Sequence, residues 1–347
     1  MTQHSPAATD EMDERGHKGL TAALRAAHGA NAVVTIYQVQ SLQNGTVGDV
    51  RLITGFMDTA AGSGLPFRVV QKTQSKWERP GDPGSWRREY DLYRSGLDAL
   101  FDHALRWPAC YHAEMNDAQD ETRIWTEYID GASGYDLTPD MLEGAAYALG
   151  RFQGRLYAAR PDILDKLTNL SDVLFVKNRW LQIQSWQALR GHIQSDTGGL
   201  PAHLRRMLME AEAEADHAWQ RIQRLPIVLC HRDFWVTNIL GLGDSTVLID
   251  WDTAGWGHLG EDIASLMADE PDVPRMLENY RRCVPAYLRG FSEHADVPPA
   301  TERCIRDMML FSYGFRLAAW HMTADTGEGR ALQVETLQKI FEIRAMP

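Results

Sequence analysis

Residues 227–264 read IVLCHRDFWVTNILGLGDSTVLIDWDTAGWGHLGEDIA and are the most informative stretch of the chain. Two short apolar segments, 227–229 and 247–249, with a Gly/Asp/Ser turn at 243–245, predict buried strands joined through a hairpin-like turn. Asp233 and Asn238 follow the first segment, and Asp250 follows the second. This spacing suits phosphoryl transfer, because one Asp can orient a substrate hydroxyl while the Asn and the other Asp hold Mg²⁺ against nucleotide phosphates. The alternative is a polar loop between core strands, in which Asp and Asn serve only as turn formers.

The composition is that of an ordinary globular protein. The 347 residues suffice for two modest domains or one bilobed one, and 44% hydrophobic residues supply a core. A formal net charge of −12 argues against binding a phosphate backbone, so no nucleic-acid partner is predicted. The charge is compatible with cationic ligands, although a solvated acidic surface is the commoner meaning.

The cysteines and the hydropathy indicate a cytoplasmic protein. No Cys-x-x-Cys pair occurs, which favours reduced thiols over a disulfide framework or a zinc site. No apolar run approaches the roughly 20 residues of a membrane-spanning helix, so no membrane partner is predicted. Residues 1–18 are polar and acidic and lack the apolar core of a signal peptide. We therefore predict that residues 1–19 form a disordered leader. The cysteines are Cys110, Cys230, Cys283 and Cys304.

The motif His-x-Asp-x-x-x-x-Asn at 231–238, followed by Ile-Asp-Trp at 249–251, resembles the aminoglycoside phosphotransferase/choline kinase-like family, which is related to protein kinases. The resemblance implies an α+β, bilobed protein kinase-like fold with a small antiparallel-sheet N-lobe and a larger, mainly helical C-lobe. It also implies that Asp233 is the catalytic Asp and that Asn238 and Asp250 are the metal ligands. The implied cofactor is Mg²⁺ with ATP as phosphoryl donor, and GTP stays open as an alternative donor.

Two further residues of this stretch are expected to support the loop. Glu261-Asp262-Ile263-Ala264 resembles the family's Asp-Leu-Ala element, which makes Asp262 the acid that braces the catalytic loop from below. We interpret His231 as a structural pin of the loop rather than as a second base.

The segment before residue 75 predicts a short helix and three strands. The helix is expected at 20–28, and the strands at 32–39, 50–54 and 66–72, with an exposed loop near 60–64. A turn with Gly45 and Gly48 lies between the first two strands. It can fold over nucleotide phosphates as a lid, or it can be an ordinary Asn-Gly hairpin turn.

Lys72 ends the third strand, and the resemblance implies that it contacts the α- and β-phosphates of the nucleotide. Lysine suits that task as a flexible point charge, and Lys76 is the local competitor. A helix is predicted at 85–93, where the resemblance makes Glu89 the ion-pair partner of the strand lysine. Asp91 is the alternative, and a glutamate near a helix N-terminus is also favoured by the helix dipole.

The segments 107–115 and 122–128 predict the last two strands of the small sheet. The resemblance places a hinge at 127–131, where backbone groups of Glu127, Tyr128 and Ile129 hydrogen-bond adenine. The expected organisation is therefore an N-lobe at 20–126, the hinge, and a C-lobe with the catalytic loop and acceptor site at 132–347.

The C-lobe should be helical. Thr138-Pro139 is a helix start signal, and an apolar stripe follows it. The aromatic residues near residue 315 are interpreted as core, with the alternative that some line an acceptor pocket and stack on a sugar or cation. They are Phe311, Tyr313, Phe315 and Trp320, with His321 beside them. Further helices are predicted at 174–194, 201–225, 276–287, 300–320 and 331–344.

Arg232 departs from the family, whose small-molecule kinases usually carry glycine there. Arg232 makes the His-Arg-Asp triplet at 231–233 similar to that of protein kinases. The short 238–250 connection and the Ile-Asp-Trp ending instead resemble the small-molecule branch. We therefore expect Arg232→Gly to have little effect on a small-molecule kinase. Asp252 can support a metal or cap the following turn.

The predicted function is ATP-dependent transfer of the γ-phosphate to a hydroxyl of a small molecule, either aminoglycoside-like or another amino- or hydroxyl-bearing acceptor. A choline/ethanolamine or sugar kinase of the same fold is the alternative within the family. A nucleotide-binding regulator without turnover is the alternative from another class. The joint presence of Lys72, Glu89, Asp233, Asn238 and Asp250 disfavours the regulator. The sequence predicts no oligomeric state.

Overall fold

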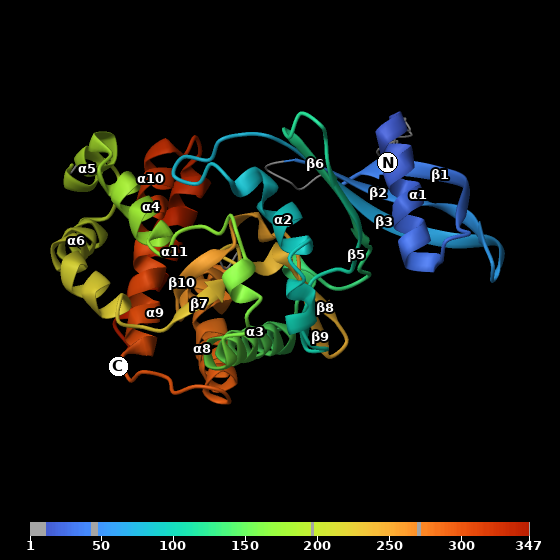
Figure 1. Ribbon diagram of the computed structural model, residues 1–347. Helices are drawn as coiled ribbons and strands as arrows, with labels where there is room; N and C mark the ends of the chain where they lie inside the picture. Colours follow the sequence, from blue (N-terminus) through green and yellow to red (C-terminus); the bar gives the residue numbers. More distant parts are fainter. Residues whose placement is uncertain (1–11, 43–47, 196–197, 269–271, 347) are drawn as a thin grey trace. The chain divides into compact units, whose positions relative to one another are not determined.

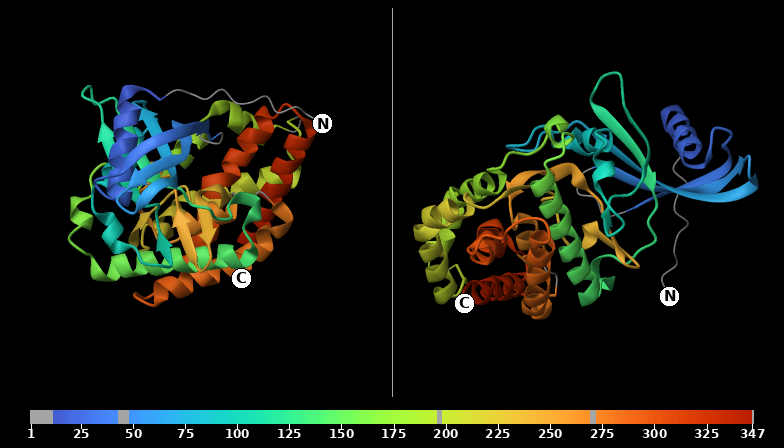
Figure 2. Two further views of the ribbon diagram at one scale, coloured as in Figure 1. Left: turned by 90° about the vertical axis from the view of Figure 1, so that its right-hand side faces the viewer. Right: turned by 60° about the horizontal axis from the view of Figure 1, so that its bottom comes forward.

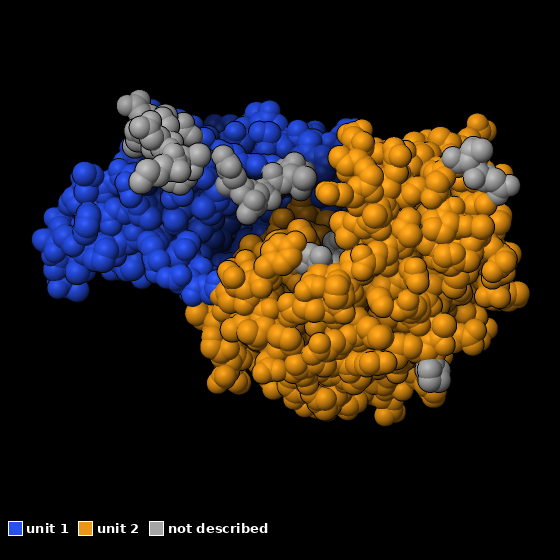
Figure 3. Space-filling model, turned by 180° about the vertical axis from the view of Figure 1, so that it is seen from behind, with its two compact units in different colours: residues 1–99, 107–131, 165–169 blue, residues 100–106, 132–164, 170–347 orange. Residues whose placement is uncertain are grey.

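The computed structural model describes residues 12–42, 48–195, 198–268 and 272–346. The chain divides into two compact units, shown in different colours in Figure 3. Unit 1 comprises residues 1–99, 107–131 and 165–169, and unit 2 comprises residues 100–106, 132–164 and 170–347. Both units are discontinuous in sequence: residues 165–169 of unit 1 lie between segments of unit 2, and residues 100–106 of unit 2 lie between segments of unit 1.

A five-stranded antiparallel sheet forms the centre of unit 1 (Figure 1). Its order is β1 (Val33–Ser41), β2 (Asp49–Thr59), β3 (Gly62–Ser75), β6 (Glu121–Glu127) and β5 (Cys110–Met115). All five strands were predicted, but the loop expected near 60–64 is a tight turn, because Thr59 and Gly62 already pair across it. Gly45 of the expected phosphate lid lies outside the described residues.

Helix α1 (Glu14–His28) packs on the sheet of unit 1. Leu20 and Leu24 contribute to a core that includes Trp125. Gly19 allows this packing, because a Cβ at that position would lie 2.2 Å from the Trp125 ring. The helix begins before the predicted start at residue 20, since the Asp13 side chain caps it by accepting from the Gly16 amide at 2.7 Å. Residues 14–19, which were assigned to a disordered leader, are therefore helical.

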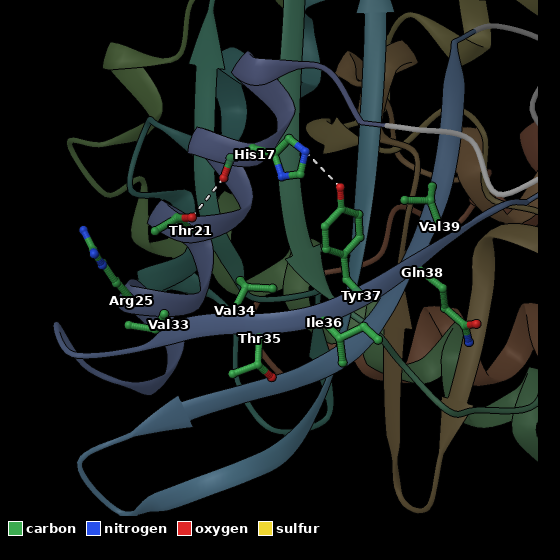
Figure 4. A pocket seen from close by; sticks show the side chains of 10 residues that line it. All are labelled: His17, Thr21, Arg25, Val33, Val34, Thr35, Ile36, Tyr37, Gln38 and Val39. Atoms are coloured by element: carbon green, nitrogen blue, oxygen red, sulfur yellow. Dashed lines mark hydrogen bonds between the residues drawn. The ribbon is translucent and has the colours of Figure 1, made fainter.

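Beside α1, strand β1 forms an edge of the sheet, and a groove of about 670 Å³ lies between them (Figure 4). The hydroxyl of Tyr37 on β1 and the Nε2 of His17 on α1 are 2.9 Å apart, which joins strand to helix. Ile36 stays exposed on the same strand.

Unit 1 also contains a helix that is anchored by a buried ion pair. Helix α2 (Ser85–Tyr93) lies where a helix was predicted to start, and the 3₁₀ turn η1 (Leu97–Leu100) follows it. Arg88 of α2 is 1% exposed and donates to both carboxylate oxygens of Asp82, at 2.8 and 2.5 Å. Such a bidentate pair fixes the start of α2.

Unit 2 is mainly helical, and α3 (Pro139–Ala159) packs closely along α8 (Val273–Ser292) (Figures 1 and 2). Thr138 caps α3 as predicted, because its hydroxyl accepts from the Met141 amide at 3.2 Å. Gly150 permits the close approach, since a Cβ there would lie 2.0 Å from the carbonyl oxygen of Tyr287.

The other helices follow the predicted order with two breaks. The helix expected at 174–194 is two helices, because Trp186 adopts an extended conformation between them. The helix expected at 300–320 contains a π-helical turn at Leu310–Gly314. The bounds are α4 (Phe175–Gln184), α5 (Gln187–Gln194), α6 (Ala202–Ile222), α7 (Glu261–Ala268), α9 (Thr301–Met309), α10 (Phe315–Thr323) and α11 (Gly327–Arg344).

The core interpretation of the aromatic residues near 315 is confirmed except at one position. Phe311 and Phe315 are buried against Trp180, with ring centroids 5.0 and 6.0 Å away, and Tyr313 is also buried. Trp320 is 40% exposed, so the core prediction is wrong there. His321 is buried.

Two small sheets of unit 2 carry the stretch 227–264. Strand β7 (Ile227–Cys230) pairs with β10 (Gly255–His258), and β4 (Leu105–Arg106), β9 (Ser245–Leu248) and β8 (Ile239–Leu242) form the other sheet. The predicted turn joins β8 to β9, and Gly243 takes the left-handed φ of 57° that it needs. Within the described residues, no helix is long and apolar enough to cross a membrane.

Candidate active site

The loop that follows β7 is held by one buried carboxylate. Asp262 is 0% exposed, and its two oxygens accept from the His231 amide at 3.0 Å and from the Arg232 amide at 2.7 Å. Arg232 has a left-handed φ of 66°, a conformation that costs a non-glycine residue about 1–3 kcal/mol. The two charge-assisted hydrogen bonds offset that cost. Asp262 thus binds the backbone of the loop, and its support of catalysis stays a prediction.

A glutamine that the sequence analysis did not single out supports Asp262. The Nε2 of Gln153, on α3, lies 2.8 Å from a carboxylate oxygen of Asp262 and 3.0 Å from the carbonyl oxygen of Leu229. Tyr287 of α8 donates its hydroxyl to the Oε1 of Gln153. Burial raises the pKa of Tyr287 and keeps this donor protonated. The only sequence signal was one polar residue on the buried stripe of α3.

His231 has both ring nitrogens engaged. The Asp233 amide lies 3.3 Å from Nδ1 and donates to it, and Nε2 lies 2.9 Å from the carbonyl oxygen of Ile249. Because a carbonyl can only accept, Nε2 carries the proton. The ring packs edge-on against Trp251, with centroids 4.5 Å apart. These contacts favour the structural role expected for His231 over a role as base.

Asp233 and Asn238 lie in direct contact. The Nδ2 of Asn238 is 2.7 Å from the Oδ2 of Asp233 and 2.9 Å from its carbonyl oxygen. The Ile249 amide donates to the Asn238 carbonyl at 3.1 Å, which brings the segment that ends in Asp250 beside Asn238. Asp250 itself takes a left-handed φ of 65° directly after Ile249.

The donor set of Asn238 and Asp250 fits a hard cation. Carboxylate and amide oxygens are ligands of Mg²⁺, and Asn238 directs its nitrogen to Asp233 and so leaves its Oδ1 for a metal. Across the described ranges, no group of three or more His, Cys, Asp or Glu could hold a metal ion. Mg²⁺ in proteins is usually bound by one or two carboxylates together with substrate phosphates and water.

Unit 1 brings together the predicted lysine and glutamate. The Nζ of Lys72, on β3, lies 2.6 Å from the Oε2 of Glu89, on α2. Asp91, the alternative partner, instead pairs with Arg87 at 2.9 Å. Lys76, the competing lysine, is exposed beyond the end of β3.

The segment predicted as a hinge begins where β6 ends. The amide of Glu127 donates to the Ala109 carbonyl at 2.9 Å, and its carboxylate accepts from the Ala109 amide at 3.1 Å. The Arg68 guanidinium lies 4.5 Å from the centre of the Tyr128 ring, and Ile129 is half-buried. Adenine binding by these three residues stays a prediction.

A family model matches most of the chain. The model described as "Phosphotransferase enzyme family" matches residues 60–293, which is more than half of the chain. The chain belongs to this family. It is therefore a phosphotransferase. No curated protein matches the chain.

Solved structures confirm the α+β, protein kinase-like fold. A GDP complex of aminoglycoside 2'-phosphotransferase-IIIa is 15% identical, with a TM-score of 0.57, and the match covers 95% of this chain and 98% of that one. Amicoumacin kinase hAmiN with AMP-PNP, Ca²⁺ and Ami is 14% identical, with a TM-score of 0.53 and coverage of 89% and 90%. Choline kinase from Cryptosporidium parvum is 15% identical, with a TM-score of 0.52 and coverage of 88% and 90%.

Proposed function

We propose that the protein transfers the γ-phosphoryl group of ATP, with Mg²⁺, to a hydroxyl of a small molecule. The observation that carries the proposal is the loop from His231 to Asn238, braced by Asp262, in which Asp233 and Asn238 are in contact beside the segment leading to Asp250. Family membership makes phosphoryl transfer the chemistry to expect from this loop.

Asp233 orients the acceptor hydroxyl and takes its proton. A bond forms between the acceptor oxygen and the γ-phosphorus, the bond from that phosphorus to the β,γ-bridging oxygen breaks, and ADP leaves with the electron pair. Proton transfer to a positioned base contributes about 10²–10⁴-fold to such a rate. Bound Mg²⁺ supplies charge neutralisation on the phosphate oxygens, and Asn238 and Asp250 would hold it.

Nucleotide binding is assigned to unit 1. Lys72, fixed by its ion pair with Glu89, contacts the α- and β-phosphates. Backbone groups of Glu127, Tyr128 and Ile129 bind the base. We propose that residues 20–126 act as the N-lobe, 127–131 as the hinge and 132–347 as the C-lobe.

The acceptor is proposed to be an aminoglycoside-like or other amino- or hydroxyl-bearing compound. This rests on the family and on the names of the structurally similar proteins, which include an amicoumacin kinase and a choline kinase. ATP is proposed as donor, with GTP as the alternative because three similar structures hold GDP. We propose a cytoplasmic location, because the four cysteines are widely scattered and include no Cys-x-x-Cys pair.

The test is a screen of aminoglycosides, amino alcohols, choline, ethanolamine and sugars with Mg-ATP, in which new phosphorylated products are detected by mass. We expect at least one product that depends on Mg²⁺ and on the nucleotide. Binding of Mg-ATP without any product across the panel would favour a nucleotide-binding regulator instead.

A further inference from the structure

The Arg232 side chain is buried within unit 2, at 2% exposure, and it contacts three polar groups and one aromatic ring. Nη1 donates to the Ser171 hydroxyl at 2.6 Å, and Nη2 donates to the carbonyl of Trp256 at 2.5 Å. Nε lies 3.3 Å from the Oε2 of Glu261. The guanidinium also packs over the Phe175 ring, 5.0 Å from its centre. Each of the three guanidinium nitrogens thus has a polar partner within 3.3 Å.

Ser171 connects Arg232 to the segment that follows Asp250. The Ser171 hydroxyl lies 2.8 Å from the carbonyl oxygen of Thr253 and 3.0 Å from that of Ala254. The Trp256 amide donates to the Ser171 carbonyl at 3.2 Å. One guanidinium therefore joins the loop that carries Asp233 to residues 253–256, a few positions after the proposed metal ligand.

Glu261 is built into the same cluster. It is 3% exposed, and its second oxygen accepts from the His258 amide at 2.8 Å. Gly257 provides the space for this carboxylate, because a Cβ at 257 would lie 2.4 Å from the Oε2 of Glu261. Glu261 directly precedes Asp262, so the residue that pairs with the Arg232 side chain adjoins the residue that binds its backbone.

The backbone conformation at position 232 favours glycine over arginine. Glycine would adopt the φ of 66° without strain, whereas arginine does so at a cost. The buried contacts of the guanidinium are what distinguish arginine from glycine here. They oppose our expectation from the sequence that Arg232→Gly has little effect.

We propose that Arg232 is a positioning residue that fixes the catalytic loop against the segment following Asp250, through Ser171, Trp256 and Glu261. The inference rests on the proposed function, because it assigns Arg232 a part in placing Asp233 relative to the metal ligand. Arg232 acts through its neighbours and does not touch the substrate.

Two variants test the role without leaving a buried charge unpaired. Arg232→Lys keeps a positive charge for Glu261 but cannot reach Ser171 and Trp256 with one planar fork. The double variant Arg232→Gly/Glu261→Gln removes both charges together. ADP formation from Mg-ATP is measured with the acceptor panel present, together with the Kd of Mg-ATP by calorimetry and the Tm. We expect kcat to fall about 10- to 100-fold with the Kd unchanged, because a displaced catalytic group costs this much.

Arg221→Ala is the matched control, since Arg221 is a half-buried arginine on α6 whose guanidinium pairs with Asp307 at 2.8 Å. It should lower the Tm and leave kcat unchanged. Ser171→Ala is a milder variant that keeps the ion pair, and it should lower kcat by a smaller factor. If the wild type is active and the Arg232 variants have the same kcat, the positioning role is overturned and the proposed function is not. The same holds if Arg221→Ala loses as much kcat as the Arg232 variants. A wild type that neither binds Mg-ATP nor forms ADP overturns the proposed function and this inference with it.

Discussion

The side-chain nitrogen Nδ2 of Asn238 lies 2.7 Å from the Oδ2 of Asp233, so the proposed metal ligand and the proposed catalytic base are joined by a hydrogen bond. Because the amide gives its nitrogen to Asp233, its oxygen points elsewhere and can serve as a ligand. The bond also fixes the Asp233 carboxylate in one orientation. A change at Asn238 should therefore disturb both metal binding and the placement of Asp233.

Asp250→Ala should weaken the binding of Mg-ATP and raise the Mg²⁺ concentration needed for half-maximal activity. The reason is that the variant removes the one carboxylate assigned to the metal, while Asn238 remains. Titration of activity with Mg²⁺ at fixed ATP measures the effect. An unchanged metal dependence would exclude Asp250 as a ligand.

Lys72→Met should raise the KM for ATP, because it removes the proposed positive charge at the phosphates and leaves Glu89 without its 2.6 Å partner. Lys76→Met is the matched control, since Lys76 is exposed just beyond the same strand. Steady-state kinetics with varied ATP distinguish the two. Equal effects of both changes would contradict the assignment of Lys72.

The pH dependence of stability should carry a contribution from Glu261. Burial raises the pKa of Glu261 to about 7 from its ordinary value of 4.5, and Arg232 opposes this shift only in part. The folded state thus binds the proton more tightly than the unfolded state. Protonated Glu261 therefore adds to the free energy of unfolding. This contribution is fully present below pH 4.5 and is lost as the pH rises through about 7, a change of about 3 kcal/mol in the free energy of unfolding.

Urea unfolding of the wild type and Glu261→Gln between pH 5 and 8 measures this contribution. We expect the free energy of unfolding of the wild type to fall with rising pH relative to that of the variant. Parallel curves for the two proteins would show that Glu261 does not titrate in this window.

The packing of α3 on α8 should tolerate no side chain at Gly150. Gly150→Ala places a Cβ 2.0 Å from the backbone oxygen of Tyr287, so we expect a loss of roughly 1–3 kcal/mol of stability. Gly144→Ala is the control on the same helix, where a Cβ meets nothing within 4 Å. That variant should gain about 0.5–1 kcal/mol, because alanine has the higher helix propensity. Thermal unfolding of both variants provides the comparison, and destabilisation by Gly144→Ala would refute the packing argument.

The sequence predicted the elements whose signals are local. Thr138 begins α3 because its cap and the following proline are adjacent in the chain, and the turn at 243–245 is likewise local. The start of α1 was missed because its cap, Asp13, lies in a stretch that is polar throughout. Gln153 and the side-chain contacts of Arg232 were missed because their partners are far away in sequence. Contacts of that kind depend on packing that no local pattern records.

Asp233→Asn in the mass-resolved transfer assay tests whether Asp233 is the catalytic residue. The variant should bind Mg-ATP with an affinity close to that of the wild type, because Asp233 does not hold the nucleotide, while the rate of product formation should fall about 10²–10⁴-fold. Product formation at the wild-type rate by Asp233→Asn would contradict this assignment, and so would a comparable loss of Mg-ATP binding.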